Sequence, residues 1–228
     1  MFYLKNLISA IIPVLKYMVL SYFVIFISYI FYILMGYTDV KNFIINYATY
    51  ILMGFNVMYI IYLLKRNRIL CRKTKSIMPF ILLGIGFSSF CNMLIFKVNT
   101  NEVVEFNLLF LILSSVIVGP FIEEIIFRYL LVKNLEKFNN KVFTILIASF
   151  VFGIIHTGIF NIIYAFLLGV ILNIIYLKNK NLLYPLLTHS SANLITLFLT
   201  GYNVYILLLS FILLVVSMLI VKRDYLLK

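Results

Sequence analysis

The segment Phe121–Arg128 contains two adjacent glutamates and an arginine within otherwise apolar sequence. Ionisable groups inside a membrane-length apolar segment cost about 2.5–3.5 kcal/mol each on insertion scales, so they usually face a polar cavity and serve a function. Glu124 and Arg128 are four residues apart, which places them on one helical face where they can pair. Glu123 lies about 100° around the helix from Glu124 and is free for chemistry. The alternative interpretation is a structural Glu–Arg pair that joins two membrane helices.

Both histidines of the chain lie further along, in other apolar segments. The sequence Phe152-Gly-Ile-Ile-His156 ends on the first, and His189-Ser-Ser-Ala-Asn193 begins with the second. His189 and Asn193 are four residues apart and therefore project from one helical face. A lone histidine in a membrane helix is more often a hydrogen-bonded packing residue than a catalyst. Two histidines together with two glutamates and an arginine favour a polar site instead.

Water-mediated attack on a carbonyl is the chemistry that suits this set of side chains. A glutamate can act as general base on a water molecule, and one imidazole can hold that water. The second imidazole and the amide can donate hydrogen bonds to the developing oxyanion. Ser190 and Ser191 adjoin His189, but consecutive positions on a helix do not face one another, so a serine nucleophile is disfavoured.

The elements that position these residues are predicted to be membrane helices. Of the 228 residues, 64% are hydrophobic and 11% are charged, and the mean hydropathy is +1.13. Apolar runs of about 20 residues match the ~30 Å hydrocarbon core of a bilayer, where a helix satisfies its own backbone hydrogen bonds. The sequence predicts an all-α polytopic membrane protein with about eight transmembrane helices, at Tyr17–Met35, Phe43–Leu64, Ile77–Phe96, Phe106–Leu131, Val142–Thr157, Ile159–Leu177, Leu182–Thr200 and Val204–Val221.

The basic residues predict the orientation of these helices. Six of them follow the second apolar segment between Lys65 and Lys75, which indicates a cytoplasmic loop. Alternate threading puts seventeen of the nineteen basic residues on that side, together with both termini. The net charge of +12 therefore indicates membrane-facing loops, and no nucleic-acid partner is expected. Residues 1–228 are expected to form one transmembrane domain with a motif-bearing core at about 106–200, and Leu7–Leu15 is interpreted as a retained interfacial or entry segment before the first span at Tyr17–Met35.

The motifs Glu-Glu-x-x-x-Arg, Phe-x-x-x-His and His-x-x-x-Asn follow one another on three predicted membrane helices. Together they resemble the signature of the CAAX protease and bacteriocin-processing family, over about Gly119–Thr196. Members of that family are intramembrane endopeptidases of the type that removes the last three residues of prenylated proteins. The resemblance implies a base at Glu123, a Glu124–Arg128 pair that shapes the site, a water-positioning His156, and oxyanion stabilisation by His189 with Asn193.

Use of a metal is left open by the sequence. The family is often described as metalloproteases, and Glu123, His156 and His189 would be the ligands if zinc were bound. The His-Glu-x-x-His arrangement of zincins is absent. A metal-free mechanism without a cofactor is favoured.

The expected partners are the lipid bilayer and a peptide or lipidated protein substrate, in the cell membrane of a bacterium. A non-catalytic bacteriocin-immunity or scaffolding protein of the same fold is the main alternative. A small transporter is a further one, although no inverted repeat supports it. Residue counting places Glu123 inward of the membrane midplane, His189 near it and His156 outward. The expected site is a water-filled cavity in the membrane, open to the cytoplasmic side.

Overall fold

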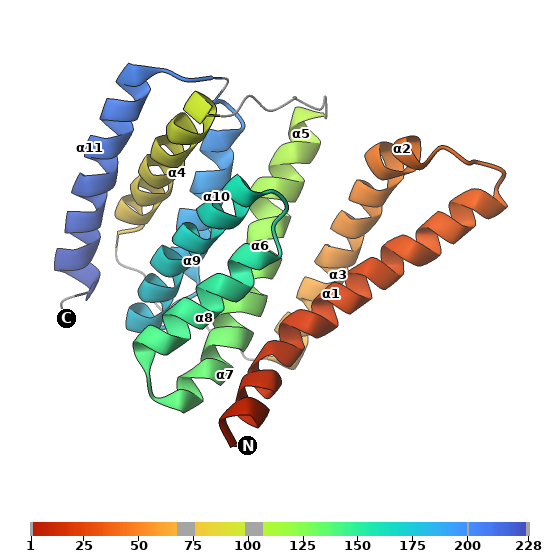
Figure 1. The fold of residues 1–228 in the computed structure, drawn as a ribbon, viewed down its shortest axis with the longest axis horizontal. Coiled ribbons are helices and arrows are strands. Elements are labelled where there is room, and N and C mark those ends of the chain that lie inside the picture. Colours follow the sequence, from red (N-terminus) through yellow and green to blue (C-terminus); the bar gives the residue numbers. More distant parts are fainter. Residues whose placement is uncertain (1, 68–75, 99–106, 200, 227–228) are drawn as a thin grey trace.

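The computed structural model of the chain describes residues 2–67, 76–98, 107–199 and 201–226, and those residues form helices and no strands (Figure 1). Each predicted apolar segment overlaps a helical stretch. The first half of the chain contains α1 (Phe2–Leu34), then α2 (Val40–Phe43), the π-helical η1 (Ile44–Ala48) and α3 (Thr49–Arg66) in one continuous stretch, and α4 (Met78–Val98).

The second half contains the stretch that carries the two glutamates, followed by four further α-helices and a short π-helical segment. That stretch runs without interruption through α5 (Leu108–Leu111), η2 (Ile112–Val118), α6 (Gly119–Glu124), η3 (Ile125–Val132), α7 (Lys133–Leu135) and η4 (Glu136–Phe138). The later elements are α8 (Lys141–Ile154), α9 (Ile159–Asn179), α10 (Leu183–Thr196), α11 (Val204–Val221) and η5 (Lys222–Leu226).

Five helical stretches of the described residues are long and apolar enough to cross a membrane: Lys5–Leu34, Met78–Ile95, Leu108–Phe138, Ile159–Asn179 and Val204–Tyr225. The chain is therefore an all-α, multi-pass membrane protein. The count of eight spans and the cytoplasmic location of the termini remain predictions. Figure 1 shows both ends of the chain toward the lower end of the bundle. The prediction that the loop after α3 is cytoplasmic rests partly on four basic residues that lie outside the described residues, namely Arg68, Arg72, Lys73 and Lys75.

Asparagine and aspartate side chains set where several helices begin. Asn107, Asn140 and Asn203 each accept backbone N–H bonds from the first turn of α5, α8 and α11, and Asp39 does so for α2. Such caps satisfy N–H groups that have no partner inside the helix. In a chain that is apolar almost throughout, these polar residues therefore mark the helix boundaries.

Small residues bring the central helices into close contact. A Cβ on Gly84 of α4 would meet the Ser191 hydroxyl and the Thr188 carbonyl of α10. A Cβ on Gly169 of α9 would lie 3.2 Å from Phe152 of α8. Backbones that approach this closely gain packing contacts that lipid does not offer. Gly158 differs from these, because its φ of +84° opens the turn into α9 and nothing lies closer than 3.9 Å to its Cβ position.

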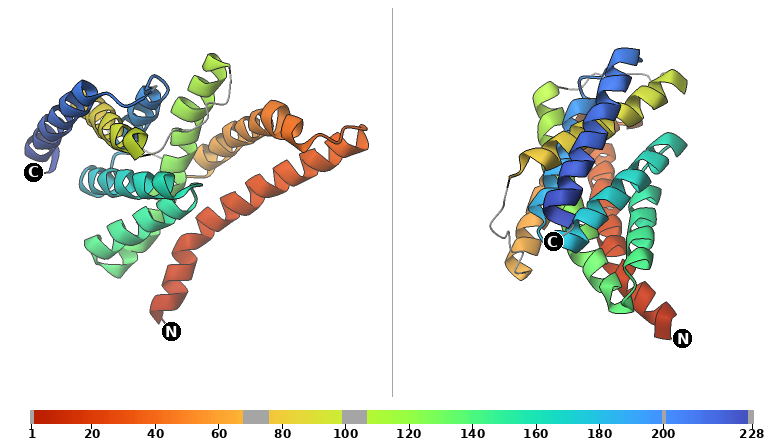
Figure 2. Two further views of the ribbon diagram at one scale, coloured as in Figure 1. Left: turned by 45° about the horizontal axis from the view of Figure 1, so that its top comes forward. Right: turned by 90° about the vertical axis from the view of Figure 1, so that its left-hand side faces the viewer.

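Helix α1 differs from the prediction, since the segment Leu7–Leu15 is not separate from the first span. It belongs to one 33-residue helix that continues through Pro13. Ala10 and Val14 in its first half are buried in the cluster that includes Leu131 and Leu135. Figures 1 and 2 show α1 and α3 at one edge of the molecule, with α4 and α11 at the opposite edge.

Candidate active site

A cavity of about 230 Å³ lies where α6, α9, α10 and the turn after α8 meet. It is lined by Glu123, His156, His189 and Asn193 together with Phe152, Asn161, Tyr164, Ala165, Leu168 and Thr196. Four of the six predicted site residues therefore share one cavity. The other two, Glu124 and Arg128, are fully buried behind it.

Glu124 connects Arg128 to His189. Its Oε2 lies 3.1 Å from Arg128 Nε, and its Oε1 lies 2.8 Å from His189 Nδ1. The Glu124–Arg128 pair was predicted from the four-residue spacing, whereas the contact with His189 was not, because it joins residues 65 positions apart. An ionised carboxylate can only accept, so Nδ1 carries the hydrogen and donates it. This bond fixes the orientation of the His189 ring and leaves Nε2 facing the cavity.

Arg128 is compensated by charge and by an aromatic ring. Its ion pair with Glu124 is close but lacks the alignment of a hydrogen bond, and its two terminal nitrogens have no hydrogen-bond partner among the described residues. The guanidinium carbon lies 4.5 Å from the centre of the Phe152 ring. A cation over an aromatic face is attracted by the ring quadrupole, more strongly where water is excluded. Phe152 therefore does more than fill the core.

The structure distinguishes the two adjacent glutamates, which the sequence alone does not. Glu124 has 0% side-chain exposure and is occupied by two partners, whereas Glu123 is 26% exposed and lines the cavity. Glu123 Oε2 lies 3.7 Å from His189 Nε2, longer than a direct hydrogen bond. The two atoms flank a gap, and a carboxylate placed in this way can reach a water molecule or a substrate oxygen.

His156 lies beyond the end of its helix rather than within it. The fifth apolar segment was predicted to be helical to Thr157, but α8 ends at Ile154 and a turn follows. With 14 residues, α8 rises about 21 Å, which is shorter than the hydrocarbon core. His156 nevertheless lines the same cavity as Glu123 and His189, although residue counting placed the three at different depths.

The ring of His156 is also oriented by a hydrogen bond. Its Nδ1 lies 2.8 Å from the carbonyl oxygen of Phe152, which can only accept, so Nδ1 carries the hydrogen. The neutral ring then presents the lone pair of Nε2. That atom can accept a hydrogen bond from water.

Asn193 has a structural partner in addition to its place in the cavity. Its Nδ2 donates to the Ser115 carbonyl oxygen at 2.8 Å. In the π-helical turn there, the Gly119 N–H bonds to the Ser114 carbonyl, five residues back. The same spacing would pair Ser115 with residue 120, which is proline and has no N–H. Asn193 therefore supplies the donor that Pro120 lacks, and its second N–H is left for the cavity.

Sequence reasoning missed the contribution of α9 to the cavity. Asn161 and Tyr164 line it, and the Tyr164 hydroxyl donates to Ser88 Oγ at 3.1 Å. Their three-residue spacing on an apolar helix was a usable signal for a shared face. No ionisable residue accompanies them there, and for that reason they were not singled out.

The proposed zinc ligands do not converge on one point. Among the described residues, no group of three or more histidine, cysteine, aspartate or glutamate side chains is placed to hold a metal ion. Glu123, His156 and His189 line the same cavity, but from separate walls. The arrangement does not fit a three-ligand zinc site.

Comparison with known proteins agrees with the motifs. Residues 105–195 match the sequence model of the type II CAAX prenyl endopeptidase Rce1-like family. This part of the chain is similar to that family. All six predicted site residues lie within the Rce1-like segment, residues 105–195. No solved structure matches the chain.

A bacterial relative matches a segment of similar length. The chain is 34% identical over 92 residues to the "Putative membrane peptidase YdiL" of Bacillus subtilis (strain 168). The match covers 40% of this chain and 37% of that relative, so the chain spans little more than a third of the relative's length. The relative's source agrees with the expected bacterial origin.

Proposed function

We propose that the chain is an intramembrane endopeptidase that hydrolyses a peptide bond of a membrane-associated or lipidated substrate with a glutamate-activated water. The observation that carries the proposal is the single cavity shared by Glu123, His156, His189 and Asn193, backed by the buried Glu124–Arg128 pair. The Rce1-like segment supports a peptidase at the level of the family.

Attack on the substrate begins with Glu123. Its carboxylate takes a proton from a water that His156 Nε2 orients, and the water oxygen bonds to the peptide carbonyl carbon. The carbonyl oxygen becomes an oxyanion. When this intermediate collapses, the C–N bond breaks and Glu123 returns the proton to the departing amine.

Stabilisation of the oxyanion falls to His189 and Asn193. A protonated His189 Nε2 donates to the oxyanion, and the Asn193 N–H that does not contact Ser115 donates a second bond. The Glu124 carboxylate holds the other ring nitrogen of His189 and balances positive charge on the ring, as an orienting acid does in a catalytic triad. Glu124 and Arg128 are therefore positioning residues. No step in this scheme uses a metal ion.

Cleavage of quenched-fluorescent peptides by the purified protein in detergent tests this proposal. Peptides with and without a lipid anchor are compared. We expect turnover by wild type, a loss of about 10²–10⁴-fold in Glu123→Gln, and no effect of a chelator. Glu136→Gln is the matched control, because Glu136 forms a half-exposed pair with Lys180 and lies outside the cavity.

Different failures have different meanings. Full activity in Glu123→Gln would show that Glu123 is not the base. Loss of turnover on chelation, restored by zinc, would show that the metal-free mechanism is wrong. A correctly folded wild type that cleaves no peptide would favour the non-catalytic immunity or scaffolding protein.

A further inference from the structure

A second, larger cavity lies between α1 and α3, with Leu130 of η3 at its base. It has a volume of about 940 Å³ and shares no lining residue with the catalytic cavity. Ligand pockets commonly measure about 300–1,000 Å³, so this α1–α3 groove has the volume of a binding site. Its lining is mostly apolar, but it also includes two cationic side chains, Lys16 and Arg66.

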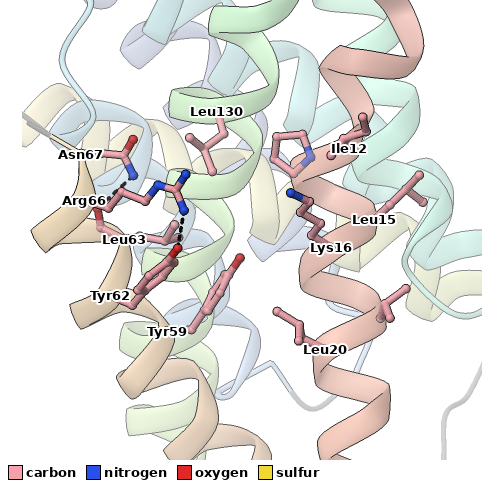
Figure 3. A pocket seen from close by; sticks show the side chains of 12 residues that line it. Ile12, Leu15, Lys16, Leu20, Tyr59, Tyr62, Leu63, Arg66, Asn67 and Leu130 are labelled. Carbon is pink, nitrogen blue, oxygen red and sulfur yellow. Dashed lines mark hydrogen bonds between the residues drawn. The ribbon is translucent and has the colours of Figure 1, made fainter.

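Two cationic side chains face each other across the groove. Figure 3 shows Lys16 of α1 and Arg66 of α3 extending into the gap from opposite walls. No carboxylate is among the lining residues, and Lys16 has no hydrogen bond or ion pair with the described residues. Lys16 belongs to an apolar helical stretch, Lys5–Leu34, where an uncompensated cation is costly unless it reaches the interface or an anion.

The wall formed by α3 has the chemistry of a membrane interface. Arg66 donates from Nη1 to the Tyr62 hydroxyl at 2.5 Å, and the Tyr59 and Tyr62 rings stack with centroids 5.8 Å apart. The other guanidinium N–H groups of Arg66 remain able to bind an anion such as phosphate. Tyrosine is enriched at the level of lipid headgroups, because its ring is apolar and its hydroxyl is polar.

The wall formed by α1 is apolar above and below Lys16. Leu15, Val19 and Leu20 line the groove and have exposed fractions of 51%, 65% and 42%. Ile12 of α1 and Leu63 of α3 add to this surface. A ligand that satisfies the groove therefore needs a negatively charged group between Lys16 and Arg66 and a hydrocarbon part against the leucines.

The walls are held in position without a ligand. Next to Lys16, the Tyr17 hydroxyl donates to Asn56 Oδ1 at 2.9 Å and joins α1 to α3. On the other side, Ala10 and Val14 are buried against the cluster that contains Leu131. A preformed site loses less free energy to ordering when it binds.

We propose that the α1–α3 groove binds an anionic phospholipid, with its phosphate between Lys16 and Arg66 and an acyl chain along the apolar wall of α1. Charge complementarity selects this occupant, since basic pockets between membrane helices bind anionic headgroups. A zwitterionic phospholipid also carries a phosphate, but its added positive group weakens the attraction to the two cations. This inference is independent of the proposed protease activity.

Lipid titration of the delipidated full chain in detergent, followed by native mass spectrometry, tests the site. The probes are phosphatidylglycerol and phosphatidylcholine with the same acyl chains. At about 1 kcal/mol for each basic residue, wild type is expected to prefer phosphatidylglycerol by about 10–30-fold. The Lys16→Gln/Arg66→Gln variant is expected to lose this preference to within about twofold.

The control variant Lys5→Gln/Lys65→Gln removes one lysine from each of the same two helices, outside the groove lining. It should keep the wild-type preference. Equal losses in both double variants, or no preference in wild type, would overturn the proposal. Inorganic phosphate that binds lipid-free protein as tightly as the lipid does would overturn the lipid assignment.

A second measurement needs no variant that removes charge. Phosphatidylglycerol with a photoreactive acyl chain should label wild-type peptides that contain residues 12–20 or 59–67. The swapped variant Lys16→Arg/Arg66→Lys should be labelled at the same peptides. Labelling spread over all exposed helices, without enrichment at these two, would contradict the proposal.

Discussion

Two helical stretches of this protein contain equally apolar windows and have very different surroundings. Lys5–Leu34 has 30 residues and Leu108–Phe138 has 31, and the most apolar 18-residue window of each has a mean hydropathy of 2.1. In the most apolar part of each, 11% of the first stretch and 39% of the second is buried inside the molecule. Hydropathy measures how readily a segment leaves water, and it does not distinguish lipid from protein as the destination.

The ionisable residues make the distinction that hydropathy cannot. Glu124 and Arg128 of the second stretch have no exposed surface and are compensated by each other and by His189. Lys5 and Lys16 of the first stretch are exposed. A charge that is placed inside a membrane protein needs a partner, whereas a charge at the edge can reach the headgroups. The difference teaches that the burial of a charged residue, more than its helix, indicates whether it needs a partner inside the protein.

The largest expected effect follows from breaking the buried pair. Glu124→Gln leaves Arg128 as an uncompensated buried cation, and removing one partner of a buried ion pair costs about 3–5 kcal/mol. We expect a marked fall in the melting temperature of the protein in detergent. Activity should fall as well, because His189 loses the carboxylate that orients it.

Glu136→Gln provides the matched control within the same stretch. Its partner Lys180 is 38% exposed, and pairs of this kind contribute about 0–1 kcal/mol. A melting temperature that falls equally in both variants would mean that burial does not set the cost of losing a carboxylate here. The contrast between the two pairs would then be lost.

The fold class could be predicted from the sequence because it depends on local patterns, whereas the roles of the candidate site residues stay predictions. Apolar runs between basic loops predict membrane helices, and the four-residue spacing of Glu124 and Arg128 predicts their pair. The contact of Glu124 with His189 depends on how two distant helices pack, and no local spacing encodes it. The roles that the resemblance implies for the two glutamates stay predictions, but their surroundings differ, since Glu123 lines the cavity and Glu124 is buried.

The end of α8 and the extent of α1 were the main errors of position. Apolar residues continue through Ile155, so hydropathy gave no reason to end the fifth helix before Thr157. The glycine at 158 and its positive φ mark the turn instead. In α1, Lys16 suggested a boundary, but a lysine can remain in a helix when its charge reaches the membrane surface. The number of spans and the orientation still rest on the sequence.

A glycine-to-alanine substitution should have opposite effects at a closely packed position and at an open one. Gly84→Ala places a methyl group against the Ser191 hydroxyl and the Thr188 carbonyl, where α4 and α10 are in close contact. Overpacking of this kind costs about 1–3 kcal/mol. Gly54→Ala on α3 meets nothing within 4 Å and should stabilise the helix by about 0.4–1 kcal/mol. Thermal unfolding of the two variants in detergent checks the signs, and a shift in the same direction for both would contradict the difference in packing.

A further expected effect concerns the π-helical turn before the glutamates. If Asn193 replaces the donor that Pro120 lacks, Asn193→Ala leaves the Ser115 carbonyl unsatisfied, at a cost of about 1–3 kcal/mol. Pro120→Ala restores a backbone N–H at residue 120. With the same π-helical spacing, that N–H can donate to the Ser115 carbonyl. A double-mutant cycle should therefore show that Asn193→Ala costs about 1 kcal/mol less in the Pro120→Ala background.

Activity separates the two roles of Asn193 in the same cycle. The restored backbone N–H can satisfy Ser115, but it cannot reach into the cavity where Asn193 lies. Stability should recover in the double variant while turnover stays low, because the second Asn193 N–H is still missing from the oxyanion. If the stability changes of the two single variants simply add, the Asn193 amide does not take the place of the backbone N–H that Pro120 lacks. Recovery of turnover together with stability would instead make Asn193 a purely structural residue, and it would assign the oxyanion to His189 without Asn193.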